Sequence, residues 1–349
     1  MKAYHRSSES KTKPKQLLEI RGLHLELQRS RKESIPVLEG IDLSIAQGET
    51  VGIVGESGCG KSVLSLSVLG LLPDAMRVKS GEIVYKEEYP LHKLGEKKVR
   101  RFRGSEIAMV FQDPMSSLNN GLTIGAQVTE MLRLHLGLSR AEANERAIGL
   151  FRKVGLSRPE ALLKEYPHQL SGGMRQRIMI AIAISCNPGL LIADEPTTAL
   201  DVTIQAQILD LLRQISEEND TSILLISHDL GVIAEMSDRI AVMYAGQIVE
   251  IGEKDEIFND PRHPYTIGLL QSIPTPAKKT EKLFSIPGTV PGLAERHSNG
   301  CRFAQRCSFA TQRCQSESPV LLDASPGHTA RCFLLEEGKK GALANAVVS

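Results

Sequence analysis

The apolar residues of this chain fall into short runs that are typical of strands. Residues 17–27 and 37–45 alternate in part between apolar and polar side chains, as half-buried strands do. Three further runs are short and almost wholly apolar, which is typical of strands buried on both faces: Thr50–Val54, Leu190–Ala193 and Ile223–Ile226. Residues 240–251 predict a hairpin that turns at Ala245 and Gly246.

The composition is that of a globular chain without a strong charge excess. The 349 residues carry 42 Lys and Arg against 41 Asp and Glu, a formal net charge of +1. A protein that coats nucleic acid needs a positive excess, and one that stacks single strands needs aromatic side chains, which make up only 4% here. A basic cluster at residues 96–103 is therefore interpreted as a solvated face, with nucleic-acid contact as the minority alternative.

The chain shows no sign of a membrane span or of export. No run of about 18 apolar residues occurs, so no membrane-spanning helix is expected. Residues 1–16 are polar and basic, without the apolar stretch of a secretory signal, and they predict a flexible tail. These features favour the cytoplasm, where disulfides are rare and clustered cysteines are first considered as metal ligands.

A glycine-rich loop connects the buried run Thr50–Val54 to an apolar helix pattern at residues 62–72. The loop matches G-x-x-x-x-G-K-[ST], and its candidate nucleotide-binding residues are Gly55, Glu56, Ser57, Gly58, Cys59, Gly60, Lys61 and Ser62. Glycines let backbone N–H groups curl around phosphate oxygens, and the positive end of the following helix dipole faces the same anion. Lys61 adds a full charge at the β- and γ-phosphates, and the Ser62 hydroxyl can bind Mg²⁺.

Two adjacent carboxylates end the apolar run that begins at Leu190. Asp194 is placed to bind Mg²⁺, directly or through water. Glu195 is one residue further along and points elsewhere, so it can orient or deprotonate an attacking water. An acidic pair after an apolar strand is common by itself, but together with the phosphate loop it predicts the second half of a nucleoside-triphosphatase site.

Further motifs accompany these two in a fixed order. They are LSGG at Leu170, Ser171, Gly172 and Gly173, Gln112 in VFQDP, TALD at residues 198–201, and His228 in LLISHDL. The whole set, over residues 17–255, resembles an ATP-binding cassette (ABC) ATPase. The resemblance identifies Gln112 as the Q-loop residue at the Mg²⁺ and γ-phosphate, Asp201 as the D-loop aspartate and His228 as the switch histidine.

The resemblance implies an α/β fold. The family's nucleotide-binding domain has a RecA-like parallel-sheet core, an antiparallel β subdomain and an α-helical subdomain. We expect this ATPase domain at residues 17–260, with the helical subdomain near residues 113–168, where helical patterns are interrupted by Gly and Pro. From about Pro261 the composition shifts to Pro, Gly and Cys, which predicts a separate C-terminal module over residues 261–349.

The resemblance also implies a mechanism in which two such ATPases sandwich two ATP molecules. Each ATP would lie between the phosphate loop of one subunit and residues 171–173 of the other, where helix N–H groups face the γ-phosphate. Glu195 and His228 would be catalytic, Glu195 by activating the attacking water and His228 by holding that water and the γ-phosphate, while Gln112 would sense Mg²⁺ and γ-phosphate. ATP binding would close the dimer and hydrolysis would reopen it.

Other segments resemble one branch of this family. IADEPTTALDVTIQAQI, the HPYT segment at His263–Thr266 and the cysteine-containing tail are similar to the ATPases of bacterial dipeptide and oligopeptide importers, above all the dipeptide-permease D-type subunits. This implies ATP hydrolysis that energises peptide import, on the cytoplasmic face of the cell membrane. The implied partners are a second ATPase, two transmembrane permeases and, indirectly, an extracytoplasmic substrate-binding protein. Importers of nickel or other metal chelates are the nearest alternative.

Two other classes agree less well with the sequence. A non-transport cassette ATPase of DNA repair or of ribosomes would show a long coiled-coil insertion, zinc modules or a second cassette, and a GTPase switch would need N-K-x-D; the chain contains none of these.

The chain departs from the ABC pattern at two positions. Met174 follows LSGG where Gln is commoner, and Leu27 stands at the apparent position of the aromatic residue that stacks on adenine.

Four of the six cysteines lie in the last fifty residues: Cys301, Cys307, Cys314 and Cys332. Their spacing, C-x5-C-x6-C-x17-C, lacks the C-x-x-C pairs of structural zinc sites and differs from the common ferredoxin runs, while four soft ligands suit either metal. Related importer ATPases with this tail carry a [4Fe-4S] cluster. The resemblance therefore implies a structural cluster at these residues, with Zn²⁺ or uncoordinated thiols as alternatives.

Overall fold

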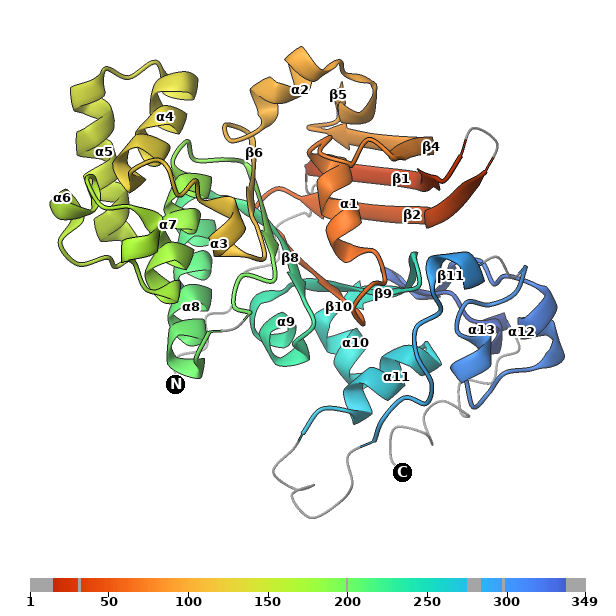
Figure 1. The fold of residues 1–349 in the computed structure, drawn as a ribbon. Helices are drawn as coiled ribbons and strands as arrows, with labels where there is room; N and C mark the ends of the chain where they lie inside the picture. Colours follow the sequence, from red (N-terminus) through yellow and green to blue (C-terminus); the bar gives the residue numbers. More distant parts are fainter. Residues whose placement is uncertain (1–14, 31–32, 199, 275–283, 297–298, 337–349) are drawn as a thin grey trace.

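The computed structural model describes residues 15–30, 33–198, 200–274, 284–296 and 299–336. The tail predicted for residues 1–16 lies outside these ranges except for Lys15 and Gln16, and Gln16 already begins the first strand. The described chain forms a small sheet, a large sheet and a group of helices to one side of them (Figure 1).

The small sheet is antiparallel and has the strand order β2-β1-β4-β5. Its strands are β1 (Gln16–Gln28), β2 (Ser34–Ala46), β4 (Met76–Tyr85) and β5 (Tyr89–Pro90). The strands predicted at residues 17–27 and 37–45 are thus confirmed. Leu18, Ile20 and Leu25 of β1 are buried in an apolar cluster shared with Ile53 of the large sheet, which joins the two sheets.

The large sheet has the order β11-β12-β10-β9-β3-β8-β7-β6. Its strands are β3 (Thr50–Val54), β6 (Ile107–Val110), β7 (Leu190–Asp194), β8 (Ser222–Ser227), β9 (Arg239–Tyr244), β10 (Gln247–Glu253), β11 (Leu322–Ser325) and β12 (His328–Ala330). The five strands from β9 to β6 are parallel neighbours, and β3, β7 and β8 are buried along their whole length, as their apolar sequences predict. β9 and β10 form the predicted hairpin at Ala245 and Gly246.

Residues 113–169, where the sequence predicts a helical subdomain, form several short helices. These are α3 (Pro114–Ser117), α4 (Ile124–Leu136), α5 (Arg140–Lys153), α6 (Pro159–Leu162) and the 3-10 helix η2 (Pro167–Gln169), and this group packs on α7 (Gly172–Ile184). α4 buries Ile124, Val128 and Leu132, a spacing of four residues that places them on one face. Ser139 starts α5 with a reciprocal cap to Glu142.

The remaining helices cover the two sheets and the C-terminal part of the chain (Figure 1). They are α1 (Lys61–Val68), α2 (Glu96–Phe102), α8 (Val202–Asn219), α9 (Leu230–Met236), α10 (Lys254–Asn259), α11 (Pro264–Gln271), α12 (Gln312–Ser316) and α13 (Phe333–Glu336), with short 3-10 turns η1 (Leu91–Lys93), η4 (Leu293–Glu295) and η5 (Ala304–Arg306). Among the residues that the structure describes, none of these helices combines the length and apolarity needed to cross a membrane.

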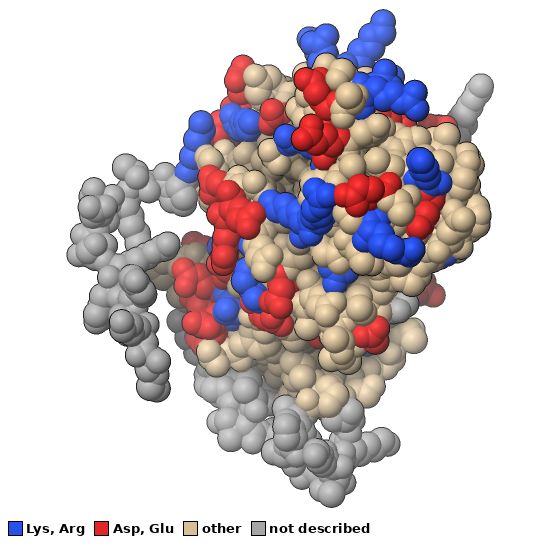
Figure 2. Space-filling view, turned by 90° about the vertical axis from the view of Figure 1, so that its left-hand side faces the viewer, with Lys and Arg blue, Asp and Glu red and all other residues tan. Residues whose placement is uncertain are grey.

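The basic cluster at residues 96–103 forms α2, and it is a solvated face as predicted. Only Val99 of the helix is buried, and Arg103 is held by Glu96 and by the carbonyl oxygen of Leu69. On the side of the molecule that carries α4 to α6, acidic and basic side chains are interspersed (Figure 2). This agrees with the near-zero net charge.

A separate C-terminal module over residues 261–349 stays a prediction, and the described part of this segment is joined to the large sheet. β12 pairs with β10 through Glu250 and Ala330, so the C-terminal strands extend the sheet of the ATPase. The buried Glu250 carboxylate accepts hydrogen bonds from the backbone N–H groups of Arg262 (2.6 Å) and His263 (2.9 Å), and it lies 2.8 Å from Nε2 of His328. These contacts bridge the expected boundary at Pro261 because a buried carboxylate must be paired. Residues 337–349 lie outside the described part.

Candidate nucleotide-binding site

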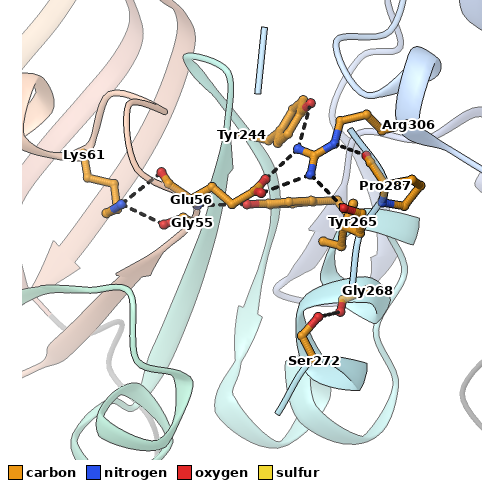
Figure 3. Close-up of polar contacts among 10 residues, drawn as sticks. Gly55, Glu56, Lys61, Tyr244, Tyr265, Gly268, Ser272, Pro287 and Arg306 are labelled. Atoms are coloured by element: carbon orange, nitrogen blue, oxygen red, sulfur yellow. Dashed lines mark hydrogen bonds and ion pairs between the residues drawn. The ribbon is translucent and has the colours of Figure 1, made fainter. Parts of the chain in front are cut away.

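The phosphate loop lies between the carboxyl end of β3 and the first turn of α1. Gly60 has φ of 112°, a conformation that favours glycine, and a Cβ on Gly55 would lie 2.1 Å from the carbonyl oxygen of Met243. Lys61 opens α1, and its Nζ donates hydrogen bonds to the carbonyl oxygens of Gly55 (2.7 Å) and Glu56 (3.2 Å) (Figure 3). The charge of Lys61 therefore lies at the mouth of the loop, where a phosphate would bind.

Asp194 ends the neighbouring strand β7 and lies beside the loop. The residue is 4% exposed, and its Oδ1 has no hydrogen-bond partner in the described structure. Burial raises the pKa of Asp194, while a hydrogen bond from the Ser62 hydroxyl and the charge of Lys61 act in the opposite direction. A buried carboxylate oxygen without a partner, beside a hydroxyl, fits Mg²⁺, which prefers oxygen ligands.

Glu195 is oriented by three side chains, two of which come from other segments of the chain. Its Oε2 accepts hydrogen bonds from Nε2 of Gln112 (2.8 Å) and from the hydroxyl of Thr198 (2.9 Å), and Nδ1 of His228 lies 3.3 Å away. Gln112 follows β6, Glu195 follows β7 and His228 follows β8, which are adjacent strands. The parallel sheet therefore brings together at one edge three residues that the sequence separates by up to 116 positions.

The backbone at Glu195 adopts a positive φ of 48°, a conformation that non-glycine residues rarely take. The backbone N–H of Glu195 donates a hydrogen bond to the carbonyl oxygen of Ile226 (2.8 Å), which stabilises this conformation. Such strain is common where a side chain must point into a reaction site.

The signature residues Ser171, Gly172 and Gly173 are not part of the group around Glu195; they lie at the start of α7. The Ser171 hydroxyl caps this helix by accepting from the N–H of Met174 (3.3 Å). α7 packs on α3, α4, α5 and β6, whereas α1 packs on β7 and η1 (Figure 1). Ser171 and Gly172 are exposed, and within the described residues no hydrogen bond joins the signature to the phosphate loop of the same chain.

Asp201, the predicted D-loop residue, caps α8: its carboxylate accepts a hydrogen bond from the N–H of Ile204 (2.9 Å). Leu27, which stands at the expected adenine-stacking position, lies on β1 and is half-buried. The positions of the loop residues, Gln112, Asp194, Glu195 and His228 agree with the predicted roles, and the roles themselves remain predictions.

Sequence reasoning missed several residues that hold this site. Thr198 binds Glu195, and three residues of the C-terminal segment bind the phosphate loop: Tyr265, Arg296 and Arg306. These three are more than 200 positions from the loop. Tyr265 lies in the HPYT segment, but neither that segment nor the sequence around the two arginines indicates a contact with the loop, since this contact depends on how the C-terminal segment folds back on the sheet.

The four tail cysteines line one pocket together with Phe303 and Phe333. Burial raises the pKa of Cys307 to about 11 and that of Cys332 to about 12, so both thiols are protonated unless a positive centre lies beside them. Among the described residues, however, no group of three or more His, Cys, Asp or Glu is arranged to hold a metal ion. The metal centre that the resemblance implies at these four residues therefore stays a prediction.

A phosphate loop on a parallel sheet, an acidic strand end and a group of helices with an exposed helix N-terminus are typical of one class of protein, the cassette ATPases. Residues 38–198 match the ABC transporter family, and residues 249–314 match the family described as the oligopeptide/dipeptide transporter C-terminal region. The chain belongs to the ATP-binding subunits of oligopeptide and dipeptide ABC transporters.

The curated relatives show how far this similarity extends. The oligopeptide transport ATP-binding protein AppD of Bacillus subtilis (strain 168) is 52% identical over 322 residues, which cover 92% of this chain and 97% of that protein. The dipeptide transport ATP-binding protein DppD of Escherichia coli (strain K12) is 49% identical over 302 residues, 86% of this chain and 92% of that protein. A solved dimeric structure of MJ0796, a bacterial ABC transporter cassette, matches with a TM-score of 0.61 at 28% identity, over 68% of this chain and 99% of that one.

Proposed function

We propose that this chain binds and hydrolyses ATP to drive the import of short peptides through a transmembrane partner. The observation that carries the proposal is the convergence of Gln112, Glu195 and His228 beside the phosphate loop. The AppD and DppD relatives are named as oligopeptide and dipeptide transport proteins, which supports peptides as the solute.

In this proposal the chain's own groups divide the work of hydrolysis. Lys61 and the N–H groups at the start of α1 bind the β- and γ-phosphates. Ser62 and Asp194 would hold Mg²⁺, which would neutralise the charge that develops on the phosphate oxygens. Glu195, held by Gln112 and Thr198, accepts the proton of the attacking water, and His228 orients the γ-phosphate and that water.

The proposal includes a second ATPase subunit. The exposed N-terminus of α7, with Ser171, Gly172 and Gly173, suits the γ-phosphate of an ATP held by the other subunit. A cassette solved as a dimer bound to ADP and phosphate matches this chain at a TM-score of 0.61, which supports the same arrangement. Hydrolysis would remove the γ-phosphate that joins the two subunits.

An apolar groove supports the docking of a transmembrane permease. Leu71, Phe111 and Leu134 line a groove between α2, α4 and β6, and each is an exposed large apolar side chain, Leu134 at 60%. Exposed apolar patches of this kind mark protein contacts. We propose that a cytoplasmic segment of each permease occupies this groove, which would place the chain at the cytoplasmic face of the cell membrane.

The cysteine pocket is proposed to hold a [4Fe-4S] cluster with a structural role. Support comes from the four cysteines that line one pocket, whose number matches the ligands of such a cluster. A cluster is wider than a single ion, so its thiols lie further apart than the ligands of Zn²⁺ do. Cys301, Cys307, Cys314 and Cys332 would bind it and thereby join segments that have little apolar core of their own.

Protein purified without oxygen tests the cluster. We expect a brown protein with about four irons and four sulfides per chain. Cys332→Ser should lower the iron content, while Cys186→Ser, a buried thiol outside the pocket, should leave it unchanged. Colourless protein with one zinc, or with no metal, would contradict the proposal.

Transport in reconstituted vesicles tests the function. The chain, its partner ATPase and the two permeases should take up a radiolabelled dipeptide only with ATP and a substrate-binding protein. Uptake should stop when Glu195 is replaced by Gln in this chain and the partner's site is also disabled. Uptake of a nickel chelate in place of peptides would establish the alternative solute.

A further inference from the structure

The outer side of the phosphate loop is held by Arg306 of the C-terminal segment. Its Nη1 donates to Oε2 of Glu56 (2.7 Å) and its Nη2 to Oε1 (3.0 Å), while Nε donates to the carbonyl of Pro287 (2.7 Å) (Figure 3). The Arg306 side chain is only 5% exposed, and its guanidinium lies over the ring of Tyr244. A two-point bond between a guanidinium and a carboxylate fixes the orientation of the partner as well as its position.

Glu56 passes this constraint to the backbone of the loop. It is the second residue of the G-x-x-x-x-G-K-S sequence, and its N–H donates to the hydroxyl of Tyr265 (2.9 Å). Its carbonyl oxygen accepts from Nζ of Lys61 (3.2 Å). The side chain, N–H and carbonyl of Glu56 are therefore all held, and a shift of this residue would move the lysine that faces the phosphates.

A second arginine fixes the same loop two residues further along. Nη2 of Arg296 donates to the carbonyl oxygen of Gly58 (2.7 Å), and its Nε donates to the carbonyl of Pro291 (3.2 Å). Because the carbonyl of Gly58 is bound from the C-terminal side, the opposite side of the loop keeps its N–H groups for an anion. The C-terminal segment thus forms hydrogen bonds with the phosphate loop at two residues, Glu56 and Gly58.

The element that carries Arg306 also carries two of the pocket cysteines. Arg306 ends the turn η5 and directly precedes Cys307, and Cys301 lies just before the same turn. Phe303 of this segment packs against the rings of Tyr244 (5.2 Å between centroids) and Tyr265 (5.4 Å). The segment from Cys301 to Cys307 therefore presents thiols to the cysteine pocket and a guanidinium to the phosphate loop.

We propose that Arg306 is a positioning residue for ATP binding: through Glu56 it holds the phosphate loop in the shape that accepts the nucleotide. This makes the ATP affinity of the loop depend on the fold of the segment Cys301–Cys307. The inference rests on the proposed role of the loop as the ATP site. Arg306 itself does not contact the nucleotide in this scheme, because its guanidinium is fully engaged with Glu56 and Pro287.

The experiment measures the dissociation constant of ATP by calorimetry on the full-length chain, with its melting temperature recorded alongside. Arg302→Met is the matched control, because Arg302 lies in the same segment, is 6% exposed and pairs with Glu39 and the carbonyl of Ala245 without binding the phosphate loop. We expect Arg306→Met to weaken ATP binding about tenfold and Arg302→Met to change it less than about twofold. Arg306→Lys, which keeps the charge but loses the two-point geometry, should fall between.

A second variant changes the other partner of the Arg306–Glu56 ion pair, which lies on the phosphate loop. Glu56→Gln leaves the C-terminal segment untouched, so it remains informative if Arg306→Met folds poorly. If Arg306 acts through Glu56, the variant that combines Arg306→Met with Glu56→Gln should bind ATP no more weakly than whichever single variant has the lower ATP affinity. Independent, multiplying losses would overturn the inference, and so would equal losses in the Arg302 and Arg306 variants.

Lys61→Ala, measured in the same assay, separates this inference from the proposed function. Unchanged ATP affinity in Lys61→Ala would contradict the proposal that the phosphate loop is the ATP site. A loss at Lys61 together with wild-type affinity in Arg306→Met and Glu56→Gln would overturn only the positioning role.

Discussion

Nε2 of Gln112 lies 2.8 Å from Oε2 of Glu195, so the residue that follows β6 orients the carboxylate that follows β7. The hydroxyl of Thr198 donates to the same oxygen. A carboxylate held by two donors has one preferred orientation, and this is what a general base needs before water arrives. A ligand that draws Gln112 away from Glu195 would free that oxygen for the attacking water.

Replacing Glu195 by Gln should leave ATP binding intact and slow hydrolysis at this site by at least about a hundredfold, because an amide cannot accept the proton of the attacking water. Phosphate release by the assembled transporter, with the partner's site disabled, measures the effect. Thr198→Val is the control: it removes only one of the orienting donors and should slow hydrolysis far less. Near-normal turnover in Glu195→Gln would contradict the role of Glu195 as the general base for the attacking water.

Replacing Lys61 by Ala should weaken ATP binding by at least about tenfold, since charge-assisted bonds to a phosphate contribute about 1.5–3 kcal/mol. Lys79→Ala provides the control, because Lys79 pairs with Glu26 on the small sheet and does not bind the phosphate loop. Titration with a fluorescent ATP analogue compares the two. Equal affinities in both variants would contradict the phosphate-loop assignment.

Replacing Asp194 by Asn should raise the melting temperature of the nucleotide-free protein at pH 7. Burial raises the pKa of Asp194 in the folded state, so its contribution to stability is present below the unfolded pKa and is lost as pH rises through the folded pKa. At pH 7 the buried charge therefore destabilises the fold, and Asn removes it. The extra stabilisation by Mg²⁺ with ATP should disappear in the same variant.

Melting curves at pH 7 with and without Mg²⁺ and ATP test both halves of this prediction. A lower melting temperature in nucleotide-free Asp194→Asn, or an undiminished response to Mg²⁺, would show that the carboxylate is not the cation site. The advantage of the variant should shrink as pH falls through the raised folded pKa and then the unfolded pKa of Asp194, below which the carboxyl is neutral in both states.

Replacing His263 by Asn should flatten the dependence of stability on acid pH. Burial, aided by the charge of Arg331, lowers the pKa of His263 to about 3, and its Nδ1 accepts the N–H of Tyr265 at the start of α11. Stability that depends on the neutral ring is complete above pH 6.5 and is lost as pH falls toward 3, by up to about 1.4 kcal/mol per pH unit. Asn can accept the same N–H without titrating.

Urea unfolding at pH 8, 6, 5 and 4 measures this effect. The two proteins should have similar free energies of unfolding at pH 8, and the wild type should lose stability faster below pH 6. Parallel pH profiles for the two proteins would contradict a lowered pKa of His263 in the folded state.

Local sequence determined the elements that place the residues of the candidate site. The runs at Thr50–Val54, Leu190–Ala193 and Ile223–Ile226 became fully buried parallel strands, because short apolar segments bounded by Gly, Asp and Ser have no other way to bury both faces. The phosphate loop could also be predicted from its residues, since glycine spacing and a lysine at a helix start carry their chemistry locally.

Only the tertiary structure decided how distant segments meet. The antiparallel pairing of β10 with β12 joins the C-terminal strands to the large sheet, and the buried Glu250, which precedes Pro261, binds groups that follow Pro261. The pairing of Arg306 with Glu56 joins residues 250 positions apart. Such contacts arise from how sheets and segments pack, and no periodicity or motif along the chain encodes them. The sequence alone therefore identified the ATP-binding chemistry, and the fold showed what holds it in place.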